Sequence, residues 1–414
     1  MQPPLSPTVP MDRARAARVA VSVLFFANGA MSSSVLPRLP AIRDALDLSK
    51  GELGTALAAM AVGGLLAGGL VGILIARFGS GRVAIVAGVL ATAVLAVVGL
   101  AFSWATLALA YLVLGMFDAT LDAAMNSHGI GIQRVYRRSI LQGFHGMWSV
   151  GGVVGSFVGA LAAAAGVPVP VHLLVVAIVL AVAILIAGRS LLPAVVADAP
   201  HGDLAEAEPV HLRALPRLLR VLLPIAMLGI LCVVLQSSAA SWSAVFLTDV
   251  LHAPAGVAAA AFTVYMAAMV LGRLTNDAWV NRFGSTAIVR VGAVLGALGL
   301  VAVIGSAPLV LTPLAFVGFA LVGLGSSPMF PVMIGAAGSR PGIPAGHGVA
   351  LVSWLVRIGL IAAPAVIGGA ADVFGLVAAL GIPFAAAIAI ALLAPVLSGG
   401  SLRRRAAVAT GAPG

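Results

Sequence analysis

Residues 171–188 read VHLLVVAIVLAVAILIAG and contain no Asp, Glu, Lys or Arg. A helix needs about 20 predominantly apolar residues to cross the hydrocarbon core of a bilayer. Other segments of the chain share this character, and short breaks with Gly and Pro separate them. The twelve predicted spans are 17–37, 52–76, 82–102, 105–128, 141–166, 171–192, 221–248, 254–278, 286–305, 309–335, 347–370 and 375–397. The pattern predicts an all-α integral membrane protein with twelve transmembrane helices.

The composition excludes a soluble protein. Of the 414 residues, 61% are hydrophobic and only 9% are charged, whereas about 25% are charged in an average soluble protein. A water-soluble domain of this length could not hide so much apolar surface. The long unbroken apolar runs also exclude a membrane β-barrel, whose strands alternate in hydrophobicity. The single cysteine, Cys232, allows neither an internal disulfide nor a cysteine-based zinc site.

The basic residues predict the orientation, because membrane proteins collect Lys and Arg on their cytoplasmic loops. With both termini in the cytoplasm, the inward-facing basic residues are Arg13, Arg15, Arg18, Arg77, Arg82, Arg134, Arg137, Arg138, Arg189, Arg213, Arg217, Arg220, Arg282, Arg290, Arg340, Arg403, Arg404 and Arg405. Only Arg38, Arg43 and Lys50 face outward, and Arg273 and Arg357 fall within spans. The net charge of +10 thus reflects the cytoplasmic loops of a multi-pass membrane protein, and we expect no nucleic-acid partner. The basic tail is expected to contact membrane lipid.

A polar stretch in the middle divides the chain into six spans and six spans. We expect an N-terminal half at 1–192, a cytoplasmic linker at 193–219, and a C-terminal half at 220–414 with a short basic tail. The linker holds four acids followed by Arg213 and Arg217. Its end could form a short helix on the inner leaflet, or the whole stretch could be a solvated connection.

The two halves repeat each other. Ala76–Ser80, with the sequence ARFGS, recurs as Asn281–Ser285, with the sequence NRFGS, at an offset of 205 residues. Asn28 matches Gln236 at an offset of 208, each near the middle of the first helix of its half. Two pseudo-symmetric six-helix halves of this kind are typical of transporters with a site at the interface of the repeats.

The repeated loops resemble those of the major facilitator superfamily over about residues 17–397. Its loop signature is G-x-x-x-D-R-x-G-x-R-R, which Gly72, Arg77, Gly79 and Arg82 fit. Ala76 stands where the superfamily has an acid that helps to clamp the inner gate. The resemblance implies a carrier that works by rocking its two halves around a central site.

Four further motifs are similar to those of the fucose-permease-like branch of this superfamily, whose bacterial members largely lack an assigned substrate. They are Asp122–Asn126 (DAAMN), Phe144–Gly152 (FHGMWSVGG), Ser241–Leu247 (SWSAVFL), and Gly272-Arg273-Leu274 with Asp277. The branch often has acids where this chain has Gln133, Gln236, Ser241 and Asn281. The resemblance therefore implies a family and a location in a bacterial plasma membrane, but no substrate.

Two acids within the fourth predicted span are candidates for proton coupling. Asp118 and Asp122 are four residues apart, so they share one face of a helix. Mutual repulsion and desolvation both disfavour the charged forms, which would let at least one acid exchange protons near neutral pH. His145 could relay protons. Alternatively, Asp122, Asn126 and His145 form a structural network between helices.

Arg357 is the main candidate for substrate binding, because an arginine at mid-bilayer must face water or a counter-charge. It could bind an anionic or hydroxyl-rich solute, or pair with Asp118 as a permanent bridge between the halves. Trp354, three residues earlier, offers a stacking surface suited to sugars or aromatic acids. If the resemblance holds, Asn28 and Gln236 line the central cavity; otherwise they bond neighbouring helices. Tyr265 is a further substrate-binding candidate.

Gating residues are expected at the inner ends of the helices. Arg77 and Arg82 belong to the first signature loop, and Arg282 belongs to its repeat. Arg273 and Asp277 are four residues apart and could form an intrahelical pair beside Arg282. Two four-spaced glycine stripes predict close helix approaches. They are Gly64, Gly68 and Gly72, and Gly151, Gly155 and Gly159.

These patterns predict a secondary active transporter that moves a small polar solute, sugar-like or an organic anion, coupled to protons. The alternatives are a drug or metabolite exporter of the same fold, or a non-transporting membrane sensor. No pattern of catalytic, phosphate-binding or metal-ligating residues is present, so we expect neither an enzyme nor a cofactor. We expect a monomer.

Overall fold

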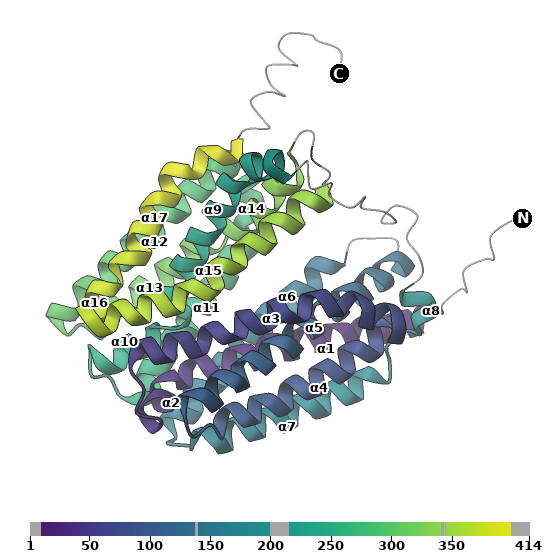
Figure 1. The fold of residues 1–414 in the computed structure, drawn as a ribbon, viewed down its shortest axis with the longest axis horizontal. Coiled ribbons are helices and arrows are strands. Elements are labelled where there is room, and N and C mark those ends of the chain that lie inside the picture. Colours follow the sequence, from purple (N-terminus) through teal and green to yellow (C-terminus); the bar gives the residue numbers. More distant parts are fainter. Residues whose placement is uncertain (1–9, 137–139, 199–214, 341–342, 344, 399–414) are drawn as a thin grey trace, which may run out of the picture. The chain divides into compact units, whose positions relative to one another are not determined.

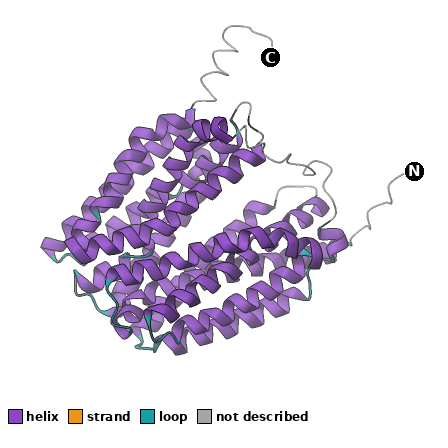
Figure 2. Ribbon diagram, in the orientation of Figure 1, coloured by secondary structure: helices purple, strands orange, loops and turns teal. Residues whose placement is uncertain are grey.

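The computed structural model describes residues 10–136, 140–198, 215–340, 343 and 345–398. Every regular element within these ranges is a helix (Figure 2). Twelve segments are long and apolar enough to cross a membrane, and each predicted span has its counterpart among them. The predicted class, an all-α membrane protein, is confirmed.

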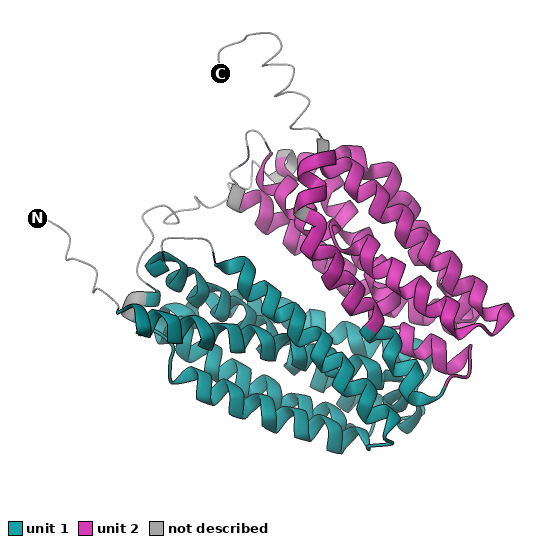
Figure 3. Cartoon of the chain, turned by 180° about the vertical axis from the view of Figure 1, so that it is seen from behind, with its two compact units in different colours: residues 1–203, 254–263 teal, residues 204–253, 264–414 magenta. Residues whose placement is uncertain are grey.

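The chain divides into two compact units, residues 1–203 with 254–263 and residues 204–253 with 264–414 (Figure 3). The elements of unit 1 are α1 (Met11–Val35), η1 (Leu36–Arg38), α2 (Leu39–Ala45), α3 (Lys50–Phe78), α4 (Ser80–Gly99), α5 (Trp104–Tyr136), α6 (Leu141–Ala164), α7 (Val169–Gly188) and α8 (Ala194–Ala197). Within unit 1, α1 packs along α6, α3 packs along α5, and α4 packs against both α5 and α7 (Figure 1).

Unit 2 follows the same plan with more interrupted helices. Its elements are α9 (Leu215–Ala240), α10 (Ser243–Asp249), most of α11 (Ala255–Phe283), α12 (Ser285–Leu309), α13 (Thr312–Ser326), α14 (Met329–Gly338), α15 (Ala345–Phe374), α16 (Leu376–Ala379), α17 (Gly381–Leu393) and η3 (Ala394–Ser398). Here α12 packs on α13 and α17, while α9 packs on α15 and α17. The start of α11, residues 255–263, belongs to unit 1.

A glycine seam joins α1 to α6. A Cβ added at Gly151 would lie 2.1 Å from the carbonyl oxygen of Phe26, and one at Gly155 would lie 2.3 Å from that of Ala30. The obstructing atoms belong to the backbone, which cannot move aside as a side chain can. The predicted close approach along this stripe is confirmed. In a membrane such packing supplies the association energy that the hydrophobic effect supplies in water.

The other predicted glycine stripe makes no close approach at two of its three positions. A Cβ added at Gly68 or Gly72 would meet no described atom within 4 Å. Instead α3 approaches α5 through Gly63, where an added Cβ would lie 1.9 Å from the carbonyl oxygen of Leu112. Gly63 lies one residue before the predicted stripe and on a different face of the helix, because successive residues are about 100° apart.

The repeated Arg-Phe-Gly-Ser loops have the same backbone conformation. Gly79 precedes α4 with φ 82° and ψ 146°, and Gly284 precedes α12 with φ 84° and ψ 155°. A positive φ of this kind is easily reached only by glycine. The duplication predicted from the sequence therefore extends to the geometry that turns one helix into the next.

Several helices differ from the predicted bounds. The prediction ended the fourth span at 128, but α5 continues to Tyr136. In this added part of the helix, the guanidinium of Arg134 donates to the carbonyl oxygen of Ala197 at 2.7 Å. The seventh predicted span ran to 248, but α9 ends at Ala240 and α10 follows separately. Residues 215–220 form the first turns of α9, so a separate surface helix at the end of the linker is wrong there. Residues 199–214 of the predicted linker lie outside the described residues.

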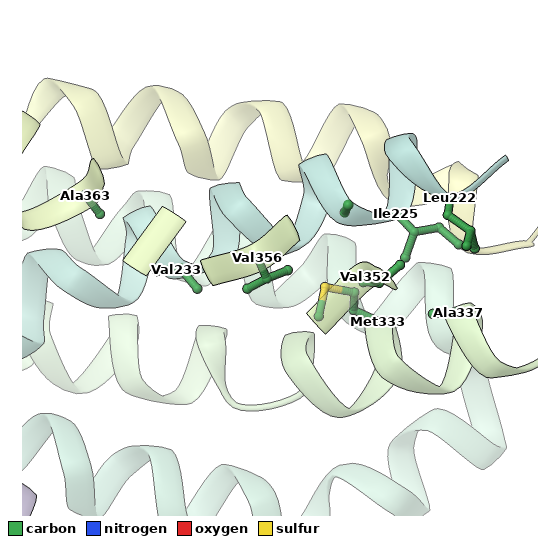
Figure 4. Close-up of a cluster of buried hydrophobic side chains, with 9 residues drawn as sticks. Leu222, Ile225, Val233, Met333, Ala337, Val352, Val356 and Ala363 are labelled. Atoms are coloured by element: carbon green, nitrogen blue, oxygen red, sulfur yellow. The ribbon is translucent and has the colours of Figure 1, made fainter. Parts of the chain in front are cut away.

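The core of unit 2 lies where α9, α14 and α15 meet (Figure 4). The cluster contains Leu222, Ile225 and Val233 from α9, Met333 and Ala337 from α14, and Val352, Val356 and Ala363 from α15. Met333 fills the space left by Gly229, where an added Cβ would lie 2.1 Å from its sulfur atom. This interface is apolar along the length of the cluster.

Candidate functional site

A polar cluster in unit 1 links three helices. The amide nitrogen of Asn28 on α1 donates to Oδ1 of Asp118 on α5 at 2.7 Å. The amide oxygen of Asn28 accepts from the indole nitrogen of Trp148 on α6 at 2.8 Å. The hydroxyl of Ser32 lies 3.5 Å from the same carboxylate oxygen. Since an indole nitrogen can only donate, the bond from Trp148 fixes which end of the amide faces Asp118.

The glycine seam holds this cluster together. A Cβ added at Gly29, the neighbour of Asn28, would lie 2.1 Å from the carbonyl oxygen of Trp148. The small residues thus bring α1 and α6 close enough for the indole of Trp148 to reach the amide of Asn28. The local sequence of small residues therefore determines the geometry of the polar groups.

The carboxylate of Asp118 has only neutral hydrogen-bond donors. No Lys, Arg or His nitrogen of the described part of unit 1 lies within 4 Å of it. The side chain of Asn28 is 3% exposed, whereas Asp118 is only partly buried. Asp122, one turn further along α5, lies within electrostatic range of Asp118. This arrangement allows the carboxyl group to gain or lose a proton without breaking an ion pair.

Asp122 and His145 occupy more exposed positions in unit 1. The amide nitrogen of Asn126 donates to the carboxylate of Asp122 at 3.1 Å and to its main-chain carbonyl oxygen at 2.8 Å. The ring of Phe25 packs edge-on against the ring of His145, with centroids 5.2 Å apart. The hydrogen bonds of Asn126 to Asp122 thus lie within one helix, and the roles of Asp122 and His145 in proton movement stay predictions.

The remaining candidates for substrate binding belong to unit 2. Tyr265 is buried, and its hydroxyl is hydrogen-bonded to Ser326, so it joins α11 to α13 in this conformation. Trp354 is 57% exposed and Arg357 is partly buried. Among the described residues of unit 2, the side chains of Arg357 and Gln236 make no ion pair and no hydrogen bond.

Two of the gating candidates, Arg77 and Arg282, occupy matching positions in the two repeated loops. The guanidinium of Arg77 lies over the ring of Phe78, 5.4 Å from its centroid, and that of Arg282 lies over Phe283 at 5.3 Å. Arg82 is exposed. Arg273 lies within electrostatic range of the Tyr265 hydroxyl. The side chain of Asp277 lies outside the described part of the structure, so its pairing with Arg273 stays a prediction.

A second polar network at one end of unit 1 was not predicted. The carboxylate of Asp198 accepts from the main-chain N–H of Ser80 at 2.9 Å, which satisfies a free donor at the start of α4. The main-chain N–H of Leu192 donates to Nε2 of His128 at 3.2 Å. Nε2 is therefore an acceptor, so Nδ1 of the neutral ring carries the hydrogen and donates to the Ser80 hydroxyl at 2.9 Å.

This network lies beside the position where the superfamily signature has its acid and this chain has Ala76. Asp198, far away in the sequence, brings a carboxylate to the same loop through α8. A polar residue such as His128 in the middle of an apolar helix was a signal for this network. The partner of that histidine could not be read from the sequence. Trp148 was missed in the same way, because nothing in its motif shows which helix its indole faces.

No group of three or more His, Cys, Asp or Glu side chains that could hold a metal ion occurs in the described part of the chain. Each of the two polar clusters described in unit 1 instead contains a carboxylate, Asp118 or Asp198, that accepts hydrogen bonds from another helix. Such an arrangement suits movement of a proton or binding of a polar solute.

The sequence and the fold are both similar to those of known transporters. The sequence matches the model of the Major Facilitator Superfamily over residues 21–364. It is 30% identical over 367 residues to an uncharacterized MFS-type transporter of Yersinia pestis, covering 88% of this chain and 91% of that protein. The fold is similar to the crystal structure of the nucleoside transporter NupG, with a TM-score of 0.76 and 13% identity, covering 92% of this chain and 98% of NupG.

The fold is also similar to a bacterial homologue of the human lysosomal transporter Spinster. The TM-score is 0.72 at 13% identity, and the similarity covers 95% of this chain and 99% of that structure. Family and fold together indicate a transporter with a small-molecule substrate rather than an enzyme. The chain is a multi-pass membrane protein that belongs to the major facilitator superfamily.

Proposed function

We propose that this transporter moves a small polar solute, sugar-like or an organic anion, and that a proton exchanged at Asp118 drives the movement. The observation that carries the proposal is the hydrogen bond of 2.7 Å from Asn28 to Asp118, in a cluster that has no basic partner among the described residues of unit 1. Alternating access of a central site by rocking of the two halves is the expected mechanism.

The surroundings of Asp118 suit reversible protonation. Asn28 and Ser32 offer hydrogen bonds that stabilise the carboxylate, whereas burial and the nearby charge of Asp122 disfavour it. Because these influences oppose each other, the two protonation states need not differ greatly in free energy. A permanent salt bridge would favour the charged state alone and would prevent the exchange.

The hydrogen bonds of Asn28 give protonation a mechanical consequence. A hydrogen bond to an ionised carboxylate is shorter and stronger than one to the neutral acid. Protonation of Asp118 therefore weakens its bond to Asn28, which also accepts from Trp148. The charge of one side chain on α5 thus changes how firmly α1 and α6 are held to it.

We assign the binding of the solute to Arg357 and Trp354 on α15, with Gln236 on α9. The two α15 side chains are three residues apart, so they lie on neighbouring positions of the helix surface. Arg357 supplies a planar group with several donors for a carboxylate or for adjacent hydroxyls. Asn28 is already engaged by Asp118 and Trp148, so contact with a solute requires one of those bonds to open.

The remaining assignments complete the proposal. Arg77, Arg82, Arg273, Asp277 and Arg282 act at the inner gate, and His145 assists proton movement. Both termini lie in the cytoplasm. Cysteines placed at Ser6, Ala205 and Thr410 of a Cys232→Ser parent should resist an impermeant thiol reagent in intact cells, and ready labelling of any of them would contradict this orientation.

The experiment has two stages. Thermal unfolding of the purified protein is first measured with a panel of monosaccharides, nucleosides and carboxylic acids, because a ligand of the folded state stabilises it. The compound found is then followed in proteoliposomes, as uphill accumulation under a proton gradient and as counterflow without one. Asp118→Asn should abolish accumulation and keep counterflow.

The control for this experiment is Asp44→Asn, which removes an exposed acid that pairs with Arg43 at 2.6 Å. This variant should accumulate the solute normally. Normal uphill accumulation by Asp118→Asn would show that the acid is structural and that coupling lies elsewhere. A panel without any stabilising compound would contradict the proposed class of solute.

A further inference from the structure

Arg38, at the end of η1 in unit 1, is buried with most of its donors unused. Its side chain is 5% exposed, and Nη2 donates to the carbonyl oxygen of Val167 at 2.6 Å. Nε and Nη1 are buried and have no hydrogen-bond partner. A guanidinium stays protonated in proteins, so it cannot avoid the cost by losing its charge. Both the charge and these donors are left uncompensated.

Among the described residues of unit 1, no acid pairs with Arg38. Arg43, the next arginine along the chain, pairs with Asp44 at 2.6 Å. Glu52 accepts from the main-chain N–H of Ser49 in the capping box of α3. In the described part of unit 1, no carboxylate oxygen lies within 4 Å of a nitrogen of Arg38. A buried, unpaired charge is strongly destabilising unless something else compensates it.

The carbonyl groups at the end of α6 do not take up the free donors of Arg38. The carbonyl oxygens of Leu161, Ala162 and Ala163 accept instead from the main-chain N–H groups of the turn that follows. These donors belong to Ala165, Val167 and Gly166, respectively. The turn that supplies the one acceptor for Arg38 therefore satisfies its own backbone and leaves Nε and Nη1 without partners.

His172 adds a second buried polar group without partners near Arg38. It is 4% exposed, both ring nitrogens lack a hydrogen-bond partner, and it lies within electrostatic range of Arg38. It occupies the first turn of α7, which contains no acid. The N-terminus of a helix of this length carries a partial positive charge that favours an anion.

We propose that Arg38 and His172 form a buried site for one small monovalent anion of the halide class. A halide only accepts hydrogen bonds, which matches the unused donors of Arg38 and the single N–H of a neutral His172. One negative charge also neutralises the positive charge of Arg38. The site belongs to unit 1 alone and is separate from the cluster around Asp118.

The test is thermal unfolding of the purified protein in sodium chloride or sodium bromide, against sodium gluconate of equal ionic strength. The halides should raise the midpoint saturably, as expected for a ligand of the folded state. Arg38→Met should lose the halide dependence, and His172→Phe should weaken it. Arg43→Met, which removes the arginine paired with Asp44, is the matched control and should keep the full response.

Equal stability of the unaltered protein in halide and gluconate would overturn the proposal, as would a halide response that persists in Arg38→Met. If Arg38→Met does not fold, the unaltered protein decides the matter. Crystals grown in sodium bromide should show an anomalous peak beside Arg38. Density there without anomalous signal would mean that water fills the site and that the proposal is wrong.

Discussion

Unit 1 and unit 2 carry the same repeat but fill its corresponding positions with different chemistry. An offset of 208 residues relates Asn28 to Gln236, Asp118 to Ser326 and Trp148 to Val356. In unit 1 these positions form a chain of hydrogen bonds across three helices. In unit 2, Ser326 donates to the carbonyl oxygen of Gly323 in its own helix, and Val356 is part of the apolar core.

The difference shows that a six-helix unit of this kind does not need the polar cluster in order to fold. Unit 2 holds its helices together with apolar side chains such as Met333, without an acid at the corresponding position. We therefore propose that the acid in unit 1 serves proton coupling rather than stability. Arg357, the charged residue of unit 2 that we assign to solute binding, lies one residue after Val356.

The largest effect is expected at the glycine seam of unit 1. Gly151→Leu places a side chain against the carbonyl group of Phe26, so we expect the protein to lose about 3 kcal/mol of stability and most of its yield. Gly359→Leu in unit 2 should cost less, since an added Cβ there lies 3.2 Å from Ile230 Cα. Thermal unfolding and gel filtration measure both.

The control for this comparison is Gly146→Leu. An added Cβ at Gly146 meets nothing within 4 Å among the described residues, so this variant should unfold at the same temperature as the unaltered protein. Equal destabilisation by Gly151→Leu and Gly359→Leu would mean that the two units do not differ in how closely their helices approach.

The next effect concerns Arg357. Lys keeps the positive charge but loses the planar group with its several donors. If Arg357 binds a carboxylate or adjacent hydroxyls, Arg357→Lys should weaken binding of the solute about 10- to 100-fold, in line with about 1.5–3 kcal/mol for a charged hydrogen bond. Titration calorimetry measures the affinity, and unchanged thermal unfolding checks the fold.

The outcome also separates binding from a structural bridge. If Arg357 only pairs with Asp118, Arg357→Lys should keep its affinity, and the loss of stability in Arg357→Ala should be partly restored by adding Asp118→Asn. The second change would restore stability because an unpaired buried charge is worse than no charge. Such a restoration, together with normal affinity in Arg357→Lys, would contradict our assignment of Arg357 to solute binding.

A smaller effect is expected at Trp148. Trp148→Phe keeps an aromatic ring but leaves the buried amide oxygen of Asn28 without its donor, at a cost of about 1–3 kcal/mol. Accumulation of the solute should fall several-fold, because the amide then loses its fixed orientation toward Asp118. Val356→Ala, the corresponding change in unit 2, should alter stability without altering the pH dependence of transport. If Trp148→Phe and Val356→Ala had the same pH profile of transport, this result would contradict the view that Trp148, Asn28 and Asp118 act together.

The smallest effect is expected at the turn before α4. Asp198→Asn weakens a charged acceptor for the N–H of Ser80 at a helix start, which should cost about 1 kcal/mol in thermal unfolding. Transport should be nearly normal. Transport that fails although the fold is stable would give this acid the gating role that the superfamily assigns to the position of Ala76.

The sequence was sufficient for the fold class, because apolar length and the distribution of arginine depend only on local composition. It also indicated the close approach at Gly151 and Gly155, since four-residue spacing places small residues on one face. It misplaced the seam of α3, where Gly63 and not the neighbouring stripe makes the contact. Which of several glycines meets another helix depends on how the helices rotate, and local spacing does not determine that rotation.

Within the candidate site, the sequence identified Asn28 and Asp118 as polar residues inside predicted membrane spans, where burying a polar group costs free energy. It placed them in separate roles, substrate binding and coupling, whereas the structure joins them by a hydrogen bond. The partners Trp148, Ser80 and Asp198 were not predicted, because each meets its partner from a distant part of the chain. Pairings of this kind follow from tertiary packing and have no periodic signature in the sequence.

The central claim is that Asp118 exchanges the proton that drives transport. The most direct measurement is the number of protons that the purified protein takes up or releases on binding its solute, followed with a pH indicator in weakly buffered solution. We predict a proton exchange in the unaltered protein that disappears in Asp118→Asn while solute binding remains. The same proton exchange in both proteins would contradict the account.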